Sequence, residues 1–137
     1  MFRRVPPRLS RQSRRPGQAM VEAAMVFLSL AVLLTGMFDL GRVFYYNVGV
    51  ANAVREGARL ATDATRTNTE ISTAVTNAAP NMSLTGITVS PNSRTITNSG
   101  QTVTVSATYD FAPVTPVMKA ILGNTYAITR SAQIMMF

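Results

Sequence analysis

The apolar run from Ala19 to Phe38 constrains the fold of this chain more than any other feature of its sequence. Its 20 residues (AMVEAAMVFLSLAVLLTGMF) include one charged side chain, that of Glu22. At 1.5 Å per residue, a helix of this length spans about 30 Å, the thickness of a bilayer's hydrocarbon core. A buried core helix would explain the same composition, but a chain of 137 residues has little else with which to bury it. The run therefore predicts a membrane-spanning helix.

Most of the net charge lies before this run. The formal net charge is +7, and residues 1–17 contain six Arg and neither Asp nor Glu. Segments on the cytoplasmic side of a membrane span are enriched in Lys and Arg, so the sequence predicts a cytoplasmic N-terminus and an exported remainder. Nucleic-acid binding would rest on this segment alone, and its place beside the span already explains its charge. We therefore expect the lipid bilayer as a partner and no nucleic acid.

The helical pattern continues past the run, over residues 40–63, which contain no proline. No small-x-small cleavage site follows the run, so a continuous helix is favoured over a secretory signal peptide. Small residues recur at every fourth position and form one ridge: Gly49, Ala53, Gly57 and Ala61. Glycine in a helix interior is costly, so the ridge predicts a closely packed neighbour. That neighbour is either the protein's own sheet or a helix of another subunit.

Two further features of this helix concern its surface. Phe44, Tyr45 and Tyr46 lie just past the apolar run, where aromatic residues gather at a membrane–water interface. Asp39 and Arg42, at positions i and i+3, are expected to pair on the helix surface. We assign no chemistry to this pair.

Two shorter helices are expected in the exported part. The first covers residues 66–79, with Ile71, Val75 and Ala78 on one face. The second is a short apolar helix within residues 114–122. Both are compatible with a small domain of mixed structure.

Period-two alternation of apolar and polar residues predicts antiparallel strands. They begin at Ile87 and Val89, continue over residues 103–111, and end over residues 126–136, where Arg130 falls on the inward face. Turns are expected between them at residues 91–93 and 98–100. The predicted fold class is α+β: a long N-terminal membrane-spanning helix extends into a small exported domain, whose three- to four-stranded antiparallel sheet packs on the helix.

The sequence offers little for catalysis. It contains no Cys and no His, which removes disulfides, thiolate ligands, cysteine nucleophiles and the commonest general base. The acids of the exported part are scattered, and no glycine-rich phosphate loop is present. We expect no enzymatic activity, no cofactor, no metal and no small-molecule substrate.

The junction before the apolar run is the most informative local feature. Glu22 is the fifth residue after Gly17, and a carboxylate one turn inside a membrane span is costly and usually paired. If the chain is cleaved after Gly17, the new α-ammonium of Gln18 lies about 6 Å from Glu22 along the helix axis. Glu22 is then placed to pair with the N-terminus of a neighbouring subunit. The alternative is that Glu22 reaches the membrane surface and pairs with nothing.

Three blocks together mark a family: Gly17–Glu22, Phe38–Tyr45 and Asn52–Arg59. A basic leader that ends in Gly, followed by a helix with Glu at its fifth position, resembles the signal of type IV pilins and pseudopilins. The three blocks in register resemble the TadE-like family, which supplies minor pseudopilins of the Tad (tight adherence, Flp-type) pilus system.

The resemblance implies cleavage between Gly17 and Gln18 by a prepilin peptidase, and a role for Glu22 in subunit assembly. It also implies other Tad pilins and pseudopilins and an inner-membrane assembly platform as partners. The protein is then located in a bacterial cell membrane or incorporated in an extracellular adhesive pilus. The other interpretation is an uncleaved single-pass membrane anchor that displays a small exported binding or structural domain.

The expected domain organisation has four parts. They are a basic cytoplasmic leader (1–17), a transmembrane helix (18–39), its exported continuation (40–63), and a small polar α+β domain (64–137).

Overall fold

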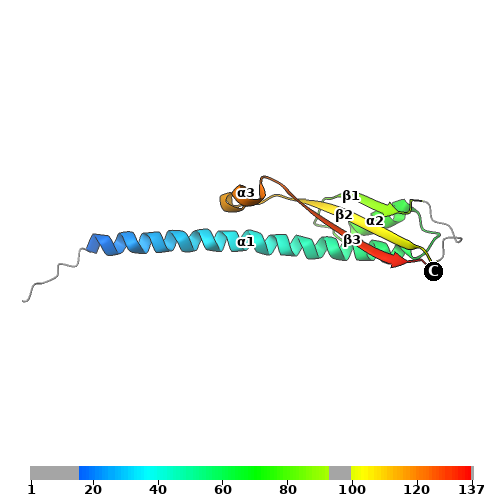
Figure 1. Ribbon diagram of the computed structural model, residues 1–137, viewed down its shortest axis with the longest axis horizontal. Helices are drawn as coiled ribbons and strands as arrows, with labels where there is room; N and C mark the ends of the chain where they lie inside the picture. Colours follow the sequence, from blue (N-terminus) through cyan, green and yellow to red (C-terminus); the bar gives the residue numbers. More distant parts are fainter. Residues whose placement is uncertain (1–15, 93–99, 137) are drawn as a thin grey trace, which may run out of the picture. The chain divides into compact units, whose positions relative to one another are not determined.

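The computed structural model describes residues 16–92 and 100–136 (Figure 1). The chain divides into two units, with the boundary between Leu33 and Leu34. Helix α1, Pro16–Ala61, contributes to both units. It begins at Pro16, where the missing N–H of proline removes no intrahelical hydrogen bond. The long helix predicted from the apolar run and its continuation is therefore confirmed.

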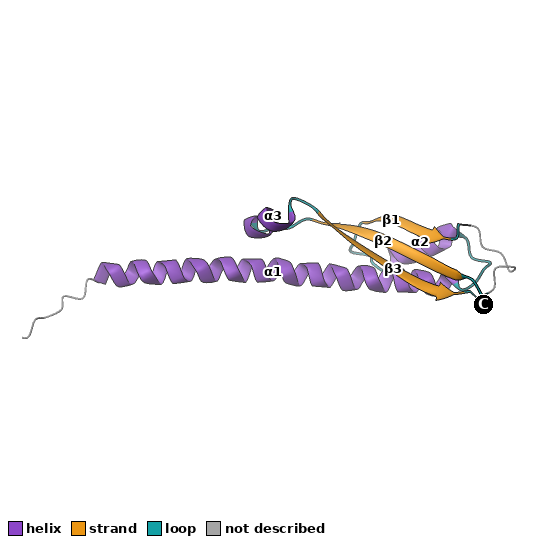
Figure 2. Ribbon diagram, viewed as in Figure 1, coloured by secondary structure: helices purple, strands orange, loops and turns teal. Residues whose placement is uncertain are grey.

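The second unit contains a three-stranded antiparallel sheet, in the order β1-β2-β3 (Figure 2). Its strands are β1, Leu84–Ser90, β2, Thr102–Phe111, and β3, Tyr126–Met135. The predicted α+β class is confirmed, with three strands. Of the two predicted turns, at 91–93 and 98–100, residue 93 and residues 98–99 lie outside the described residues.

The alternation along β2 places apolar residues on one face and threonines and serines on the other. Val103, Val105, Ala107 and Phe111 are buried. On the other face the strands are joined through hydroxyl groups, with 2.9 Å between the Oγ1 atoms of Thr108 and its β3 partner. A sheet with one polar and one apolar face needs a cover on the apolar face only.

Helix α1 and helix α2, Asn68–Asn77, provide that cover. One contiguous cluster of buried residues joins both helices to the sheet: Val50, Ala53, Val54, Ala58, Ala61, Ile71, Val75, Ala79, Val103, Val105, Ala107 and Met136. The core therefore lies between the C-terminal part of α1, α2 and the central strand β2.

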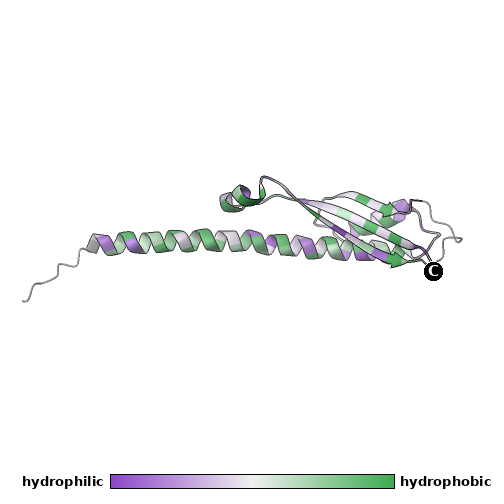
Figure 3. Ribbon diagram, viewed as in Figure 1, coloured by the Kyte–Doolittle hydropathy of each residue, from purple (hydrophilic) through white to green (hydrophobic). Residues whose placement is uncertain are grey.

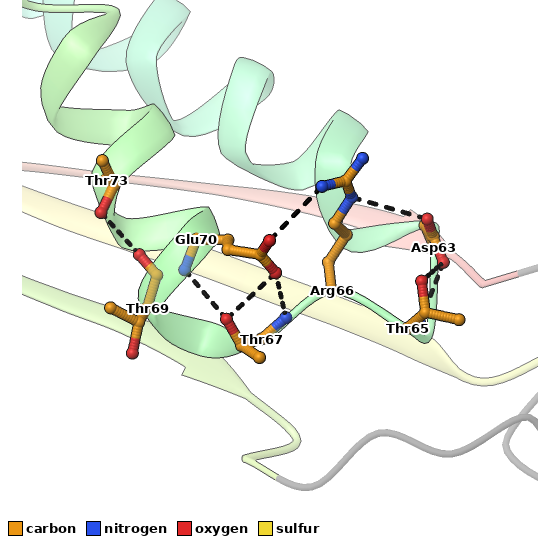
Figure 4. Close-up of polar contacts among 7 residues, drawn as sticks. All are labelled: Asp63, Thr65, Arg66, Thr67, Thr69, Glu70 and Thr73. Carbon is orange, nitrogen blue, oxygen red and sulfur yellow. Dashed lines mark hydrogen bonds and ion pairs between the residues drawn. The ribbon is translucent and has the colours of Figure 1, made fainter.

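Helix α2 begins two residues later than predicted, because Thr67 is its N-cap. The Oγ1 atom of Thr67 accepts a hydrogen bond from the backbone N–H of Glu70, and the Glu70 carboxylate accepts one from the backbone N–H of Thr67 (Figure 4). The hydrogen bonds from the backbone N–H and the hydroxyl of Thr67 to the carboxylate lower the pKa of Glu70, and Arg66 nearby favours the charged carboxylate further. Reciprocal capping of this kind defines where the helix begins.

The prediction for the buried face of α2 was wrong at one position. Ile71 and Val75 are fully buried, but Ala78 is exposed and Ala79 is buried in its place. The cause is the helix end: Ala78 is the C-cap, so helical spacing no longer applies beyond Asn77.

The predicted short helix is α3, Pro116–Leu122. Thr115 caps it by accepting a hydrogen bond from the N–H of Met118, at 3.3 Å, and Pro116 occupies the first turn. At the other end the capping residue Gly123 has a φ of 82°, a value that favours glycine.

Strand β3 departs from the predicted alternation at Tyr126, which is exposed, whereas Ile128 is buried. Arg130, predicted on the inward face, donates a hydrogen bond from Nε to Oδ1 of Asn47 on α1. Arg130 itself is exposed, so its position on this face buries no charge.

Candidate functional site along helix α1

The N-terminal part of α1 presents an uncovered apolar surface. Every residue from 17 to 33 is exposed, and green and pale residues dominate this part of the helix in Figure 3. The helix is long and apolar enough to cross a membrane, and none of its most apolar window is buried. Large exposed apolar surfaces mark sites of contact with a membrane or another protein. This segment is consistent with a single-pass membrane protein.

Three residues of the predicted junction are exposed at the start of α1: Gly17, Gln18 and Glu22. Apart from its chain neighbours and the backbone of its own helix, no atom of the described residues lies within 4 Å of the position that a Cβ would take at Gly17. Gln18 and Glu22 are on the helix surface, and within the described ranges no ion pair joins Glu22 to another side chain. Among the described residues, the Glu22 carboxylate is therefore exposed and not engaged in an ion pair.

The small-residue ridge lies in the second unit and is occupied by the chain itself. A Cβ added at Gly57 would overlap Cγ2 of Val75 and lie 3.3 Å from Cγ1 of Val105. A Cβ added at Gly49 would overlap the end of the Met82 side chain. The other two ridge residues are fully buried: Ala53 and Ala61. The two neighbours considered for the ridge were the protein's own sheet and a helix of another subunit. The described contacts lie within the chain, with α2, β2 and the loop before β1.

Asp39 is the main polar feature of the second unit, and the expectation that it lies on the helix surface was wrong. Its side chain is fully buried. Oδ2 accepts hydrogen bonds from the backbone N–H of Thr115 at 2.8 Å, from Thr115 Oγ1 at 2.7 Å, and from the N–H of Val114 at 3.1 Å. Oδ1 lies 3.1 Å from Nη1 of Arg42, so the predicted pair with Arg42 is present. A buried carboxylate is tolerated when donors surround it in this way.

The Asp39 cluster fixes α1 to the segment between β2 and α3. Thr115 uses its hydroxyl twice, as a donor to Asp39 and as an acceptor for the cap of α3. Neither Val114 nor Thr115 was predicted as a partner of Asp39. The dipeptide Thr115-Pro116 is a helix-start signal, but it does not indicate which helix binds it.

An aromatic cluster adjoins Asp39 on the sheet side. The guanidinium of Arg42 lies 5.1 Å from the ring centroid of Phe111, and Tyr46 stacks on Tyr109 with 4.5 Å between centroids. Burial raises the pKa of Tyr109, and its hydrogen bond with Tyr46 raises it further. Of the three aromatic residues predicted at a membrane interface, Phe44 and Tyr45 are exposed, whereas Tyr46 is half-buried against the sheet.

The site contains packing and anchoring groups rather than reactive ones. In residues 16–92 and 100–136 no group of three or more Asp and Glu residues is arranged to hold a metal ion. The arrangement can bind lipid or protein along the exposed part of α1, and it holds the sheet on the buried part.

Comparison with known proteins finds a similarity in the N-terminal part of the chain. No curated protein and no solved structure matches the chain significantly. The family model described as TadE-like protein matches residues 17–59, about a third of the chain, which begins at the predicted cleavage position and includes Glu22 and the ridge residues as far as Gly57. The resemblance seen in the sequence is thus confirmed over residues 17–59, which match the TadE-like family, a family of structural Tad pilus components rather than of enzymes.

Proposed function

We propose that this protein is a minor pseudopilin that is inserted in the inner membrane and takes part in assembly of an adhesive Tad-type pilus. The observation that carries this proposal is the TadE-like match over residues 17–59. The match includes both the junction and the exposed helix, which are the parts that the proposed role uses. The six Arg of residues 1–17 support an orientation with the N-terminus in the cytoplasm.

Processing is the first step of the proposed role. A prepilin peptidase cleaves between Gly17 and Gln18 and removes the basic leader. The exposure of both residues supports access by the peptidase. The product is a chain of residues 18–137 that starts with a free α-ammonium, directly before the apolar helix.

Assembly is the second step, and Glu22 has the central part in it. Its carboxylate is exposed on an apolar helix surface, where an unpaired charge is unfavourable in lipid. The N-terminal α-ammonium of a neighbouring Tad pilin or pseudopilin neutralises it. Because opposite charges attract strongly in a medium of low dielectric constant, this pair sets the depth of one subunit against the next. The assembly platform of the inner membrane supplies the neighbouring subunits.

The rest of the chain has a structural role in this proposal. The Asp39 cluster and the ridge hold the sheet domain on α1, so that the domain and the helix move into the pilus together. No catalytic step, cofactor, small molecule or nucleic acid is needed for it.

The assembly step is tested with Glu22→Gln in cells that make the pilus. The matched control is Glu56→Gln, which removes an exposed carboxylate from the same helix, 2.6 Å from Arg59. We expect Glu22→Gln to reach the membrane in normal amounts but to yield fewer pili in the sheared fraction, whereas Glu56→Gln behaves as the unmodified protein. Equal pilus yields for the two variants would show that the carboxylate of Glu22 has no role in assembly.

A further inference from the structure

Helix α3 differs from α2 in what it buries. Helix α2 buries Ile71 and Val75 and presents polar residues outward. Helix α3 has no buried residue, although its sequence, PVMKAIL, is largely apolar (Figure 3). Val117 is 36% exposed and Ile121 is 70% exposed. Such exposure in a helix that is not part of the core indicates contact with something outside the fold.

The position of α3 in the second unit indicates what that contact is. Its N-cap, Thr115, donates two hydrogen bonds to Asp39, and Asp39 directly follows the apolar run that ends at Phe38. The first turn of α3 is therefore fixed at the point of α1 where the predicted membrane span ends. Phe38, 69% exposed, and Phe44, 60% exposed, lie on either side of this point along α1.

The charge and periodicity of α3 fit a lipid surface. Val117 and Ile121 are four residues apart and share one side of the helix. Lys119 is two residues from each, about 200° around the helix axis from Val117. It is also the only charged residue between Phe111 and Tyr126. A short segment with an apolar side, one cation and no carboxylate suits the boundary between lipid headgroups and acyl chains.

We propose that α3 is a second membrane contact of this protein, distinct from the spanning helix. Val114, Val117 and Ile121 enter the outer edge of the bilayer, and Lys119 reaches the lipid phosphates. The Asp39 cluster makes this possible, because it satisfies the carboxylate and holds the start of α3 at the end of the span. The contact goes beyond the pilus role, since it depends only on α1 crossing a bilayer.

The test uses tryptophan, which the chain lacks, so that each introduced indole is the only one present. The full chain is reconstituted in phosphatidylcholine vesicles that contain a minority of phosphatidylglycerol, with no pilus component added. Ile121→Trp reports on α3, Leu28→Trp reports on the span, and Gln133→Trp reports on an exposed position of β3. Quenching is measured with lipids brominated near the headgroup and with iodide in the water, and far-UV circular dichroism verifies that each variant is folded.

We expect Ile121→Trp to be quenched by brominated lipid at least ~threefold more than Gln133→Trp and to be shielded from iodide. Val117→Trp, on the same side of α3, should behave alike. Quenching of Ile121→Trp by iodide to the same degree as Gln133→Trp would overturn the proposal. Shielding from both quenchers would also overturn it, because a protein surface would then cover α3. Leu28→Trp shows whether α1 has entered the bilayer, so a failure of insertion is distinguished from these outcomes. No pilus component is present, so pilus assembly affects none of the quenching measurements.

Discussion

Replacement of Asp39 by Asn should loosen the attachment of α3 to α1 while leaving the size of the side chain unchanged. Oδ2 of Asp39 accepts three hydrogen bonds, from the backbone N–H groups of Val114 and Thr115 and from the Thr115 hydroxyl. Oδ1 faces Arg42. An amide has one oxygen and one NH₂ group, so in either orientation the NH₂ group points at a donor.

The expected loss of stability in Asp39→Asn is set by the orientation of the introduced amide that costs less free energy. With the amide oxygen in the place of Oδ2, the three bonds to residues 114 and 115 keep their geometry but lose the charge of their acceptor, and the interaction of Oδ1 with Arg42 is lost as well. A hydrogen bond to a charged group contributes about 1.5–3 kcal/mol, against about 0.5–1.5 kcal/mol between neutral partners, so each of the three bonds is weakened. We therefore expect a loss of about 2 kcal/mol, which corresponds to a roughly 30-fold change in the opening equilibrium. Asp39→Ala removes every acceptor and should cost about 3–5 kcal/mol.

The assay is hydrogen exchange of the full chain in nanodiscs, followed by mass spectrometry of peptides that cover residues 112–123. The amides of Val114 and Thr115 should exchange roughly 30-fold faster in Asp39→Asn than in the unmodified protein. Glu56→Gln, which removes an exposed charge from the same helix, should leave these amides unchanged. If Asp39→Asn exchanges at the unmodified rate, Asp39 does not hold this segment and the reasoning fails.

Three further predictions concern packing and pH. Gly57→Ala should lower the free energy of unfolding by about 1–2 kcal/mol in chemical unfolding, because the added Cβ would overlap Val75. Gly41→Ala, where space is open, should raise it by up to ~1 kcal/mol. Equal effects of the two substitutions would contradict close packing at Gly57. Tyr46→Ala should lower the free energy of unfolding by about 2 kcal/mol, because the stacking on Tyr109 is lost. Tyr45, which is 63% exposed, should lower it by less than ~0.5 kcal/mol when replaced by Ala. Hydrogen exchange of the β2 amides measures both effects. The hydrogen bonds that lower the pKa of Glu70 stabilise the fold at pH values above 4.5, the ordinary pKa of this carboxyl group. This stabilisation is lost as the pH falls through the lower pKa of Glu70 in the folded state. A carboxyl ¹³C titration of Glu70 with a midpoint at or above 4.5 would contradict this prediction.

Local patterns were sufficient to predict most of the elements. The apolar run and the alternation along residues 103–111 depend on neighbours in sequence, and both were confirmed. The start of α2 at Asn68 was missed by two residues, although Thr67 and Glu70 form a capping pair visible in the sequence. Boundaries of this kind depend on one or two hydrogen bonds, which periodicity does not report.

The burial of Asp39 was not predictable from local pattern, because its partner Thr115 is 76 residues away. At i and i+3 on one helix, Asp39 and Arg42 are indistinguishable from an exposed ion pair. The ridge was different, because glycine at positions 49 and 57 predicts a close neighbour without identifying it. In both cases the sequence indicates a special position, and the three-dimensional contact determines its role.

The N-terminus of the protein in its own cells tests the pseudopilin account most directly. The protein is purified from membrane and pilus fractions, and its intact mass and N-terminal peptide are determined by mass spectrometry. The account predicts a chain that begins at Gln18, and an increase in mass by residues 1–17 when the prepilin peptidase is absent. A chain that keeps residues 1–17 in cells with an active peptidase would contradict the account and support an uncleaved membrane anchor.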